Sequence, residues 1–302
     1  MDKIIIHGGK PLKGEVTLSG AKNAVLPIMA ASLLVEGTTH ISRVPDLRDT
    51  RTMIKLLELV GAKTHLKGND LWIDSEHVDT PVAPYDLVKT MRASFYVLGP
   101  LLARFGETKV SLPGGCAWGP RPVDFHIEGM KKLGAKIDLE GGYIIAKSNR
   151  LVGNKIVLPK ISVGATGNIL MASVLAKGDT EIHNAAAEPE IQQLCHFLNS
   201  MGAKISDIGT NIIKIQGVDS LNNIDNVAVI PDRIEAGTFL IAAAATGGKI
   251  KLNNVNPMHL ETVISHLKTA NINLKVYDDS IVVSSGGKNI SACNMETNEY
   301  PG

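Results

Sequence analysis

The chain has 302 residues, of which 44% are hydrophobic and 20% charged, as in a globular protein with one large or two ordinary domains. Its net charge of +1 and interspersed signs argue against a nucleic-acid or anionic-membrane surface and leave room for a small anionic ligand held by local cations. The longest apolar stretches, 24–35 and 238–246, are too short to cross a bilayer. No signal peptide is visible, and the three cysteines fit neither a disulfide framework nor a zinc spacing, so we expect a cytoplasmic protein with reduced thiols.

In chain order, the first predicted element is a short strand at residues 4–6. Four nearly all-apolar helices follow, and because a helix that is apolar on every side is normally buried, we expect each of them inside the core. These helices cover 24–35, 95–103, 169–176 and 238–245. A short strand comes after each helix, at 38–42, 108–112, 179–183 and 249–253. A polar segment at 222–226 is expected to approach a domain boundary.

An internal repeat organises these elements. The motif Val60-Gly-Ala-Lys63 returns at Leu133 and Met201, at spacings of 73 and 68 residues, with a degenerate fourth copy at Ala270. Each copy closes a helix with an amphipathic pattern, and its glycine, or Asn271 in the fourth copy, is predicted to be a left-handed helix stop. The repeat therefore predicts four units of buried helix, strand, amphipathic helix and two strands, packed with pseudo-symmetry.

The loop after the strand 108–112 is a candidate lid. Gly114 and Gly115 give it mobility and prolines limit it at both ends, which suits a loop that closes over a ligand. Cys116 lies at its tip, and Arg121, five residues further on, favours the thiolate. An incidental loop cysteine is the alternative, which the Gly-Gly-Cys and Arg-Pro flanks weaken.

Cationic side chains recur at the start of every buried helix. They are Lys22 (followed by Asn23), Arg92, Lys160 and Arg233. Helix N-termini attract anions, so these ends are predicted to converge on one anionic ligand, although a single such residue is also consistent with a solvated surface cation. His126, near the lid, is predicted to contribute at most indirectly. Cys195 is predicted to pack in the core, and Glu188-Pro189 to begin a helix.

Five segments closely resemble the UDP-N-acetylglucosamine enolpyruvyl transferase family, and the likeness runs from Ile4 to about Pro301. They are Ser19-Gly-Ala-Lys-Asn23, Met91-Arg-Ala-Ser94, Leu112-Pro-Gly-Gly-Cys116, Arg121-Pro-Val-Asp124 and Ser162-Val-Gly-Ala165. The resemblance implies an α/β fold of two inverted α/β barrels, each with pseudo-threefold repeats, buried helices and outer sheets. It also implies that 21–230 form a complete domain that carries the lid, and that 1–20 with 231–302 form a partial second domain.

The family moves the enolpyruvyl group of phosphoenolpyruvate to the 3′-hydroxyl of UDP-N-acetylglucosamine and releases phosphate, at the start of bacterial peptidoglycan precursor synthesis. By resemblance, Lys22, Asn23 and Arg121 hold phosphoenolpyruvate, while Cys116 protonates its methylene carbon and is alkylated by fosfomycin. The implied nucleotide-sugar site comprises Arg92, Arg121, Pro122, Val123, Asp124, Phe125, Lys160, Ile161, Ser162 and Val163. No metal, organic cofactor, nucleic acid or membrane partner is implied.

Two departures from the family pattern bear on function. Trp118 is bulkier than the aliphatic residue expected in the lid. The family has six units, and this chain stops in the fourth, so we expect a C-terminally truncated protein that lacks the aspartate base and turns over poorly or not at all. The alternatives are an inactive remnant or UDP-sugar-binding fragment, which a stop codon directly after Gly302 would favour. A 5-enolpyruvylshikimate-3-phosphate synthase is a further alternative, against which the Gly-Gly-Cys lid argues.

Overall fold

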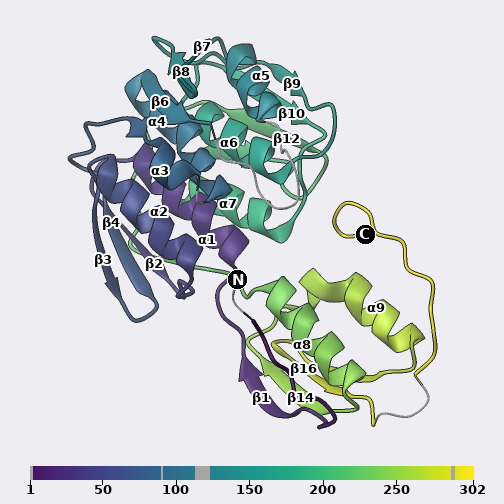
Figure 1. Ribbon diagram of the computed structural model, residues 1–302. Helices are drawn as coiled ribbons and strands as arrows, with labels where there is room; N and C mark the ends of the chain where they lie inside the picture. The colour runs from purple at the N-terminus through teal and green to yellow at the C-terminus, as the bar shows by residue number, and fades with distance from the viewer. Residues whose placement is uncertain (1–2, 90, 113–122, 287–289) are drawn as a thin grey trace. The chain divides into compact units, whose positions relative to one another are not determined.

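The computed structural model describes residues 3–89, 91–112, 123–286 and 290–302 (Figure 1). The predicted lid residues Cys116, Trp118, Arg121 and Pro122 lie outside these ranges. The chain divides into two compact units: unit 1 is Met1–Ala21 with Pro231–Gly302, and unit 2 is Lys22–Ile230. No helix among the described residues combines the length and the apolar character needed to cross a membrane.

Unit 2 repeats one arrangement three times, as the Gly-Ala-Lys motif predicts. Each repeat has a buried helix, then a strand, an amphipathic helix and an antiparallel strand pair. The buried helices are α1 (Lys22–Ala31, extended by η1, Ser32–Leu34), α4 (Leu98–Phe105, preceded by η2, Arg92–Val97) and α6 (Val163–Ser173). The amphipathic helices are α2 (Arg48–Leu59), α5 (Asp124–Lys132) and α7 (Pro189–Ser200), and a short α3 (Tyr85–Val88) precedes η2.

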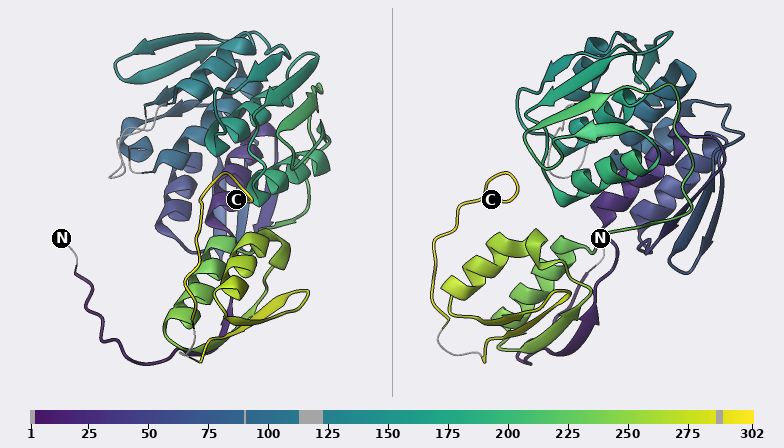
Figure 2. Two further views of the ribbon diagram at one scale, coloured as in Figure 1. Left: turned by 90° about the vertical axis from the view of Figure 1, so that its right-hand side faces the viewer. Right: turned by 180° about the vertical axis from the view of Figure 1, so that it is seen from behind.

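Three four-stranded sheets cover these helices, and Figures 1 and 2 show the sheets on the outside of unit 2. Their orders are β13-β2-β4-β3, β5-β6-β8-β7 and β11-β12-β10-β9. The strands are β2 (Thr38–Ser42), β3 (Lys63–Lys67), β4 (Asp70–Asp74), β5 (Val82–Ala83), β6 (Glu107–Ser111), β7 (Lys136–Glu140), β8 (Tyr143–Lys147), β9 (Lys155–Val157), β10 (Asp179–His183), β11 (Lys204–Ser206), β12 (Ile212–Gln216) and β13 (Val227–Ala228). Burial alternates along strands such as β4 and β8, so each sheet turns one apolar face inward.

Unit 1 holds a fourth copy of the same arrangement. Its sheet, β1-β14-β16-β15, packs against α8 (Arg233–Ala245), while α9 (Glu261–Thr269) follows η3 (Pro257–Leu260). The strands are β1 (Lys13–Thr17), β14 (Lys249–Asn253), β15 (Asn273–Val276) and β16 (Ser280–Ser284). Two edge strands come from a distant part of the chain, because β1 precedes α1 yet pairs with β14 in unit 1, while β13 precedes α8 yet pairs with β2 in unit 2.

The predicted helix stops are confirmed. The φ angles of Gly61, Gly134 and Gly202 are +107°, +89° and +100°, and Asn271 has a φ of +65°. All four residues directly follow the C-cap of an amphipathic helix, where a left-handed residue ends the helix. The recurrence of one backbone conformation at four sites shows that the sequence repeat is a structural repeat.

The strand predicted at residues 4–6 is wrong. Ile4, Ile5 and Ile6 are 86%, 67% and 83% exposed, and they lie in irregular structure. The first strand of the described chain is instead β1, which the sequence analysis did not predict. An apolar run of three residues forms no strand without a neighbouring strand, whereas the polar β1 segment pairs with β14 along five residues.

The expectation that all four apolar helices are buried holds in unit 2 and fails for α8. In α1, every residue from Ala24 to Ala31 is buried. In α8, Ile234 and Ile241 are 53% and 55% exposed. The physical reason is coverage: within unit 1, a single four-stranded sheet packs against α8, so only one side of this helix is buried.

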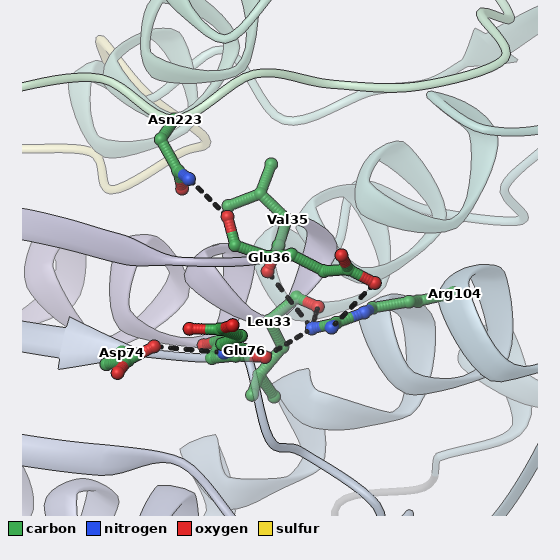
Figure 3. Close-up of polar contacts among 8 residues, drawn as sticks. Leu33, Val35, Glu36, Asp74, Glu76, Arg104 and Asn223 are labelled. Atoms are coloured by element: carbon green, nitrogen blue, oxygen red, sulfur yellow. Dashed lines mark hydrogen bonds and ion pairs between the residues drawn. The ribbon is translucent and has the colours of Figure 1, made fainter.

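Arginines satisfy the C-terminal ends of buried helices in unit 2. One guanidinium nitrogen of Arg104 donates to the carbonyl oxygens of Leu33, Val35 and Ser75, each at 3.0 Å, and a second lies 3.7 Å from Glu36 (Figure 3). Desolvation lowers the pKa of Arg104 from its ordinary value. Arg150 donates to the carbonyl oxygen of residue 175 in the same way. Because helix C-termini leave carbonyl groups unpaired, these two cations have a structural role.

Candidate functional site

The predicted site residues meet at the opposite ends of the buried helices. A pocket of about 500 Å³ in unit 2 is lined by Lys22 and Asn23 of α1, by Arg92 of η2, and by Ser162 and Val163 at the start of α6. The other lining residues are Leu26, Asp49, Met91, Ala93, Phe95, Tyr96, His126 and Gly164. The pseudo-threefold packing brings these ends together, because each buried helix enters the core in the same sense.

The pocket is electropositive. Neither α1 nor α6, both of which are fully described, carries an acidic residue in its first turn, so neither helix neutralises the positive end of its own dipole. The Ser162 side chain caps α6 by accepting a hydrogen bond from Ala165 N at 3.4 Å. Lys22 Nζ lies 3.4 Å from Asp49 Oδ2, and both side chains are partly exposed. The charge of Arg92 also reaches His126, whose pKa it helps to lower.

Other predicted residues lie near the start of α5 or before α6 and are not among the residues that line the pocket. Val123 is buried, Asp124 is the exposed first residue of α5, and Phe125 is partly exposed. Lys160 Nζ lies 6.0 Å from the centroid of the Phe125 ring, which brings the two predicted segments together. Ile161 is partly exposed beside Lys160. At α8 in unit 1, Asp232 caps the helix by accepting from the backbone N–H groups of residues 234 and 235.

Two residues of the pocket, Asp49 and His126, are not predicted as site residues from the sequence. Asp49 lies in the first turn of α2 and pairs with Lys22, and no motif marks it. His126 is buried and lines the pocket, although the sequence assigns it at most an indirect role. Desolvation of the buried ring, together with the charge of Arg92, lowers the pKa of His126 to about 3, so the ring is neutral near pH 7.

A larger depression of about 1410 Å³ lies at the other ends of the same helices. It is lined by Arg104 and Arg150 among others, and by none of the predicted site residues. Both arginines are bound to carbonyl oxygens of helix ends. The smaller pocket is therefore the candidate site. Among the described residues, no group of three or more His, Cys, Asp or Glu side chains is arranged to hold a metal ion.

Comparison with known proteins first defines the class. The family model described as EPSP synthase (3-phosphoshikimate 1-carboxyvinyltransferase) matches residues 6–302. The enolpyruvyl transferase NikO from Streptomyces tendae matches 92% of this chain and 67% of its own, with a TM-score of 0.82 and 23% identity. EPSP synthase from Acinetobacter baumannii covers 96% of this chain and 68% of its own, with a TM-score of 0.74 and 22% identity. The fold is therefore that of the enolpyruvyl transferases, as expected.

Closer relatives specify the family. A UDP-N-acetylglucosamine 1-carboxyvinyltransferase from Dichelobacter nodosus is 51% identical over 302 residues, which are all of this chain and 72% of the relative. One from Chloroherpeton thalassium is 54% identical over 306 residues, covering all of this chain and 70% of the relative. The chain belongs to the UDP-N-acetylglucosamine 1-carboxyvinyltransferase family, as its sequence motifs predict.

Proposed function

We propose that the site of this chain serves the reaction of its family in the cytoplasm, in which the 1-carboxyvinyl group of phosphoenolpyruvate moves to UDP-N-acetylglucosamine. The supporting observation is the pocket of unit 2, where two helix N-termini meet Lys22 and Arg92. Its volume of about 500 Å³ suits a small-molecule ligand. Both proposed substrates carry phosphate groups, which match an electropositive site of this kind.

For the donor substrate, we assign Lys22, Asn23 and Arg121 to phosphoenolpyruvate. Lys22 and Asn23 begin α1, so a phosphate or carboxylate placed there meets the helix N-terminus as well as the Lys22 ammonium group. Asp49 holds Lys22 Nζ at 3.4 Å without fully enclosing it. This ion pair keeps the lysine oriented in the absence of an anion.

The chemistry proposed is addition followed by elimination. The 3′-hydroxyl of the sugar gives its proton to a base and its oxygen forms a bond to C2 of phosphoenolpyruvate, while the Cys116 thiol gives a proton to C3. The bond from C2 to the phosphate oxygen then breaks and phosphate leaves, C3 returns a proton to the Cys116 thiolate, and the double bond is restored. Charge develops on the phosphate as it leaves, and fixed cations and helix N-termini stabilise that charge without reorganising. The same thiol is proposed as the nucleophile that fosfomycin alkylates.

For the acceptor substrate, we assign Arg92, Arg121 to Phe125, and Lys160 to Val163. Arg92, Ser162 and Val163 line the same pocket, and Lys160 lies over the Phe125 ring. The proposed product is a precursor of peptidoglycan, so the activity would contribute to cell-wall synthesis and through it to cell shape and division.

Isothermal titration with UDP-N-acetylglucosamine tests this assignment. Arg92→Gln is expected to weaken binding at least tenfold, because a hydrogen bond to a charged group contributes about 1.5–3 kcal/mol. Lys131→Gln is the matched control, since it removes the same charge from an exposed ion pair on α5 outside the pocket and should leave binding unchanged. Equal affinities of the wild type and Arg92→Gln for UDP-N-acetylglucosamine would contradict the assignment of this pocket to the acceptor.

A further inference from the structure

A buried amide on α6 links this helix to η2, α4 and α5. Asn168 of α6 is fully buried, and its side chain reaches the backbone of η2 and α4 and the ring of His126 on α5. Its side-chain oxygen lies 2.6 Å from the amide nitrogen of Gly99. Its side-chain nitrogen lies 2.8 Å from the carbonyl oxygen of Phe95 and 3.1 Å from His126 Nδ1.

The two backbone groups fix which end of the amide is which. A backbone N–H only donates, so the atom facing Gly99 must be the oxygen Oδ1. A carbonyl oxygen only accepts, so the atom facing Phe95 must be the nitrogen Nδ2. The second hydrogen of Nδ2 is then directed at His126 Nδ1. No alternative flip of the Asn168 amide satisfies both backbone partners.

This orientation determines the tautomer of His126. Because Nδ2 of Asn168 donates, Nδ1 of His126 must accept and carries no hydrogen. A neutral imidazole has one N–H group, so its hydrogen is on Nε2. Phe95 packs edge-on against the ring, with centroids 4.9 Å apart, and this contact holds the ring plane. Burial keeps the pKa of the ring at about 3, which excludes the doubly protonated form near pH 7.

We propose that Asn168 is a positioning residue that fixes His126 in its Nε2–H tautomer, so that a neutral donor faces the pocket and binds a phosphoryl oxygen of the substrate. The proposal rests on the proposed function. His126 lines the pocket, and its Nε2 lies beside Gly164, where an added Cβ would be 3.3 Å from this atom. Among the described residues, the only hydrogen bond of the His126 ring is the one at Nδ1.

A neutral donor at this place has a physical advantage. The pocket already holds Lys22 and Arg92, so a third cation would be disfavoured by repulsion. A neutral N–H group still satisfies an acceptor oxygen without adding charge. It also makes this contact independent of pH around neutrality, whereas an ordinary histidine titrates there. Among the described residues that line the pocket, the other titratable groups are Asp49, which is paired with Lys22, and Tyr96, whose phenol pKa burial raises.

The tautomer is tested first, without any ligand. Nitrogen-15 NMR of the ring distinguishes a protonated from a bare nitrogen, and we expect Nε2 protonated and Nδ1 bare in the wild-type chain from pH 6 to 9. In Asn168→Asp, a carboxylate replaces the donor, so Nδ1 should become protonated and the pKa of His126 should rise. A wild-type spectrum with the hydrogen on Nδ1 would overturn the proposal.

Ligand binding provides the second test. In Asn168→Asp, the imidazolium present at pH 6 still donates from Nε2, while the neutral ring present at pH 9 turns a lone pair toward the ligand. The ratio of the dissociation constants of this variant and the wild type should therefore rise about tenfold between pH 6 and pH 9. A ratio that stays constant contradicts the proposal. Ser173→Ala is the control, because it removes a buried hydrogen bond from the same helix and should show no such pH dependence.

Variants of the ring itself keep the test valid if Asn168→Asp folds poorly. His126→Phe lacks the donor and should weaken binding about tenfold, whereas His126→Gln, which offers one acceptor and one donor, should restore most of it. Titrations with UDP-N-acetylglucosamine and with phosphoenolpyruvate separately identify whose phosphoryl oxygen is bound. Binding of neither by the wild type would contradict the proposed function and this ligand contact together. Equal binding by His126→Phe and the wild type would contradict the inference alone.

Discussion

Cys116→Asp is expected to abolish covalent labelling by fosfomycin while part of the enolpyruvyl transfer remains. Labelling requires a nucleophilic sulfur, whereas proton delivery to the methylene carbon requires only an acid, which a carboxyl group also provides. Intact-protein mass spectrometry measures the label, and phosphate release measures the transfer. Rapid inactivation of Cys116→Asp by fosfomycin would remove Cys116 from the role assigned to it.

Cys195 offers the matched control for this labelling. It is fully buried on α7, and burial raises the pKa of its thiol to about 12, so almost no thiolate is present near pH 7. Cys195→Ser should therefore leave the extent and rate of labelling unchanged. The chain spans 72% of its Dichelobacter nodosus relative, so transfer is best measured both in this chain and in a chimera that carries the remainder of that relative.

Gly99→Ala is expected to lower the free energy of unfolding of unit 2 by about 2–3 kcal/mol, as overpacking does in a tight core. Gly99 lies inside α4, and an added Cβ would meet the backbone carbonyl and the side chain of Asn168 on α6. Backbone atoms cannot rotate away, so the two helices must separate. Urea denaturation followed by tryptophan fluorescence reports on unit 2 alone, because Trp72 and Trp118 are the two tryptophans of the chain.

Gly237→Ala in α8 provides a control of the opposite sign. The nearest atom to an added Cβ there is a side-chain carbon of Leu260 at 3.9 Å, an ordinary contact. Alanine is a better helix former than glycine by about 1 kcal/mol, so unit 1 should become slightly more stable. Far-UV circular dichroism follows both units. If Gly237→Ala lowered the free energy of unfolding as much as Gly99→Ala does, the steric explanation would be contradicted.

The repeat made most of the fold predictable from the sequence. The buried helices of unit 2, the amphipathic helices and the strands β2, β6, β10 and β14 follow from apolar patterns and from the Gly-Ala-Lys stops. The edge strands β1, β5, β9 and β13 were not predicted. They have two to five residues each, and their strand conformation depends on pairing with a strand from a distant part of the chain or from across a helix.

The candidate site was predictable only in part. The sequence places Lys22, Arg92 and the segment from Ser162 at the starts of buried helices, and the repeat therefore predicts that they converge. Asp49 and His126 could not be predicted in this way, because their place in the pocket depends on how α2 and α5 pack against the buried helices. The contacts of the Asn168 amide are the hardest to predict, because its partners lie 69, 73 and 42 residues away in sequence and no local pattern connects them.

The measurement that bears most directly on the proposed function is acceptor-dependent phosphate release from phosphoenolpyruvate. The chain and the chimera are each incubated with phosphoenolpyruvate and either UDP-N-acetylglucosamine or shikimate 3-phosphate. Release by the chimera that depends on UDP-N-acetylglucosamine, and falls by about 10³-fold in Lys22→Ala, is the expected result. Release that depends on shikimate 3-phosphate instead, or that is unchanged in Lys22→Ala, would contradict the assignment of this pocket.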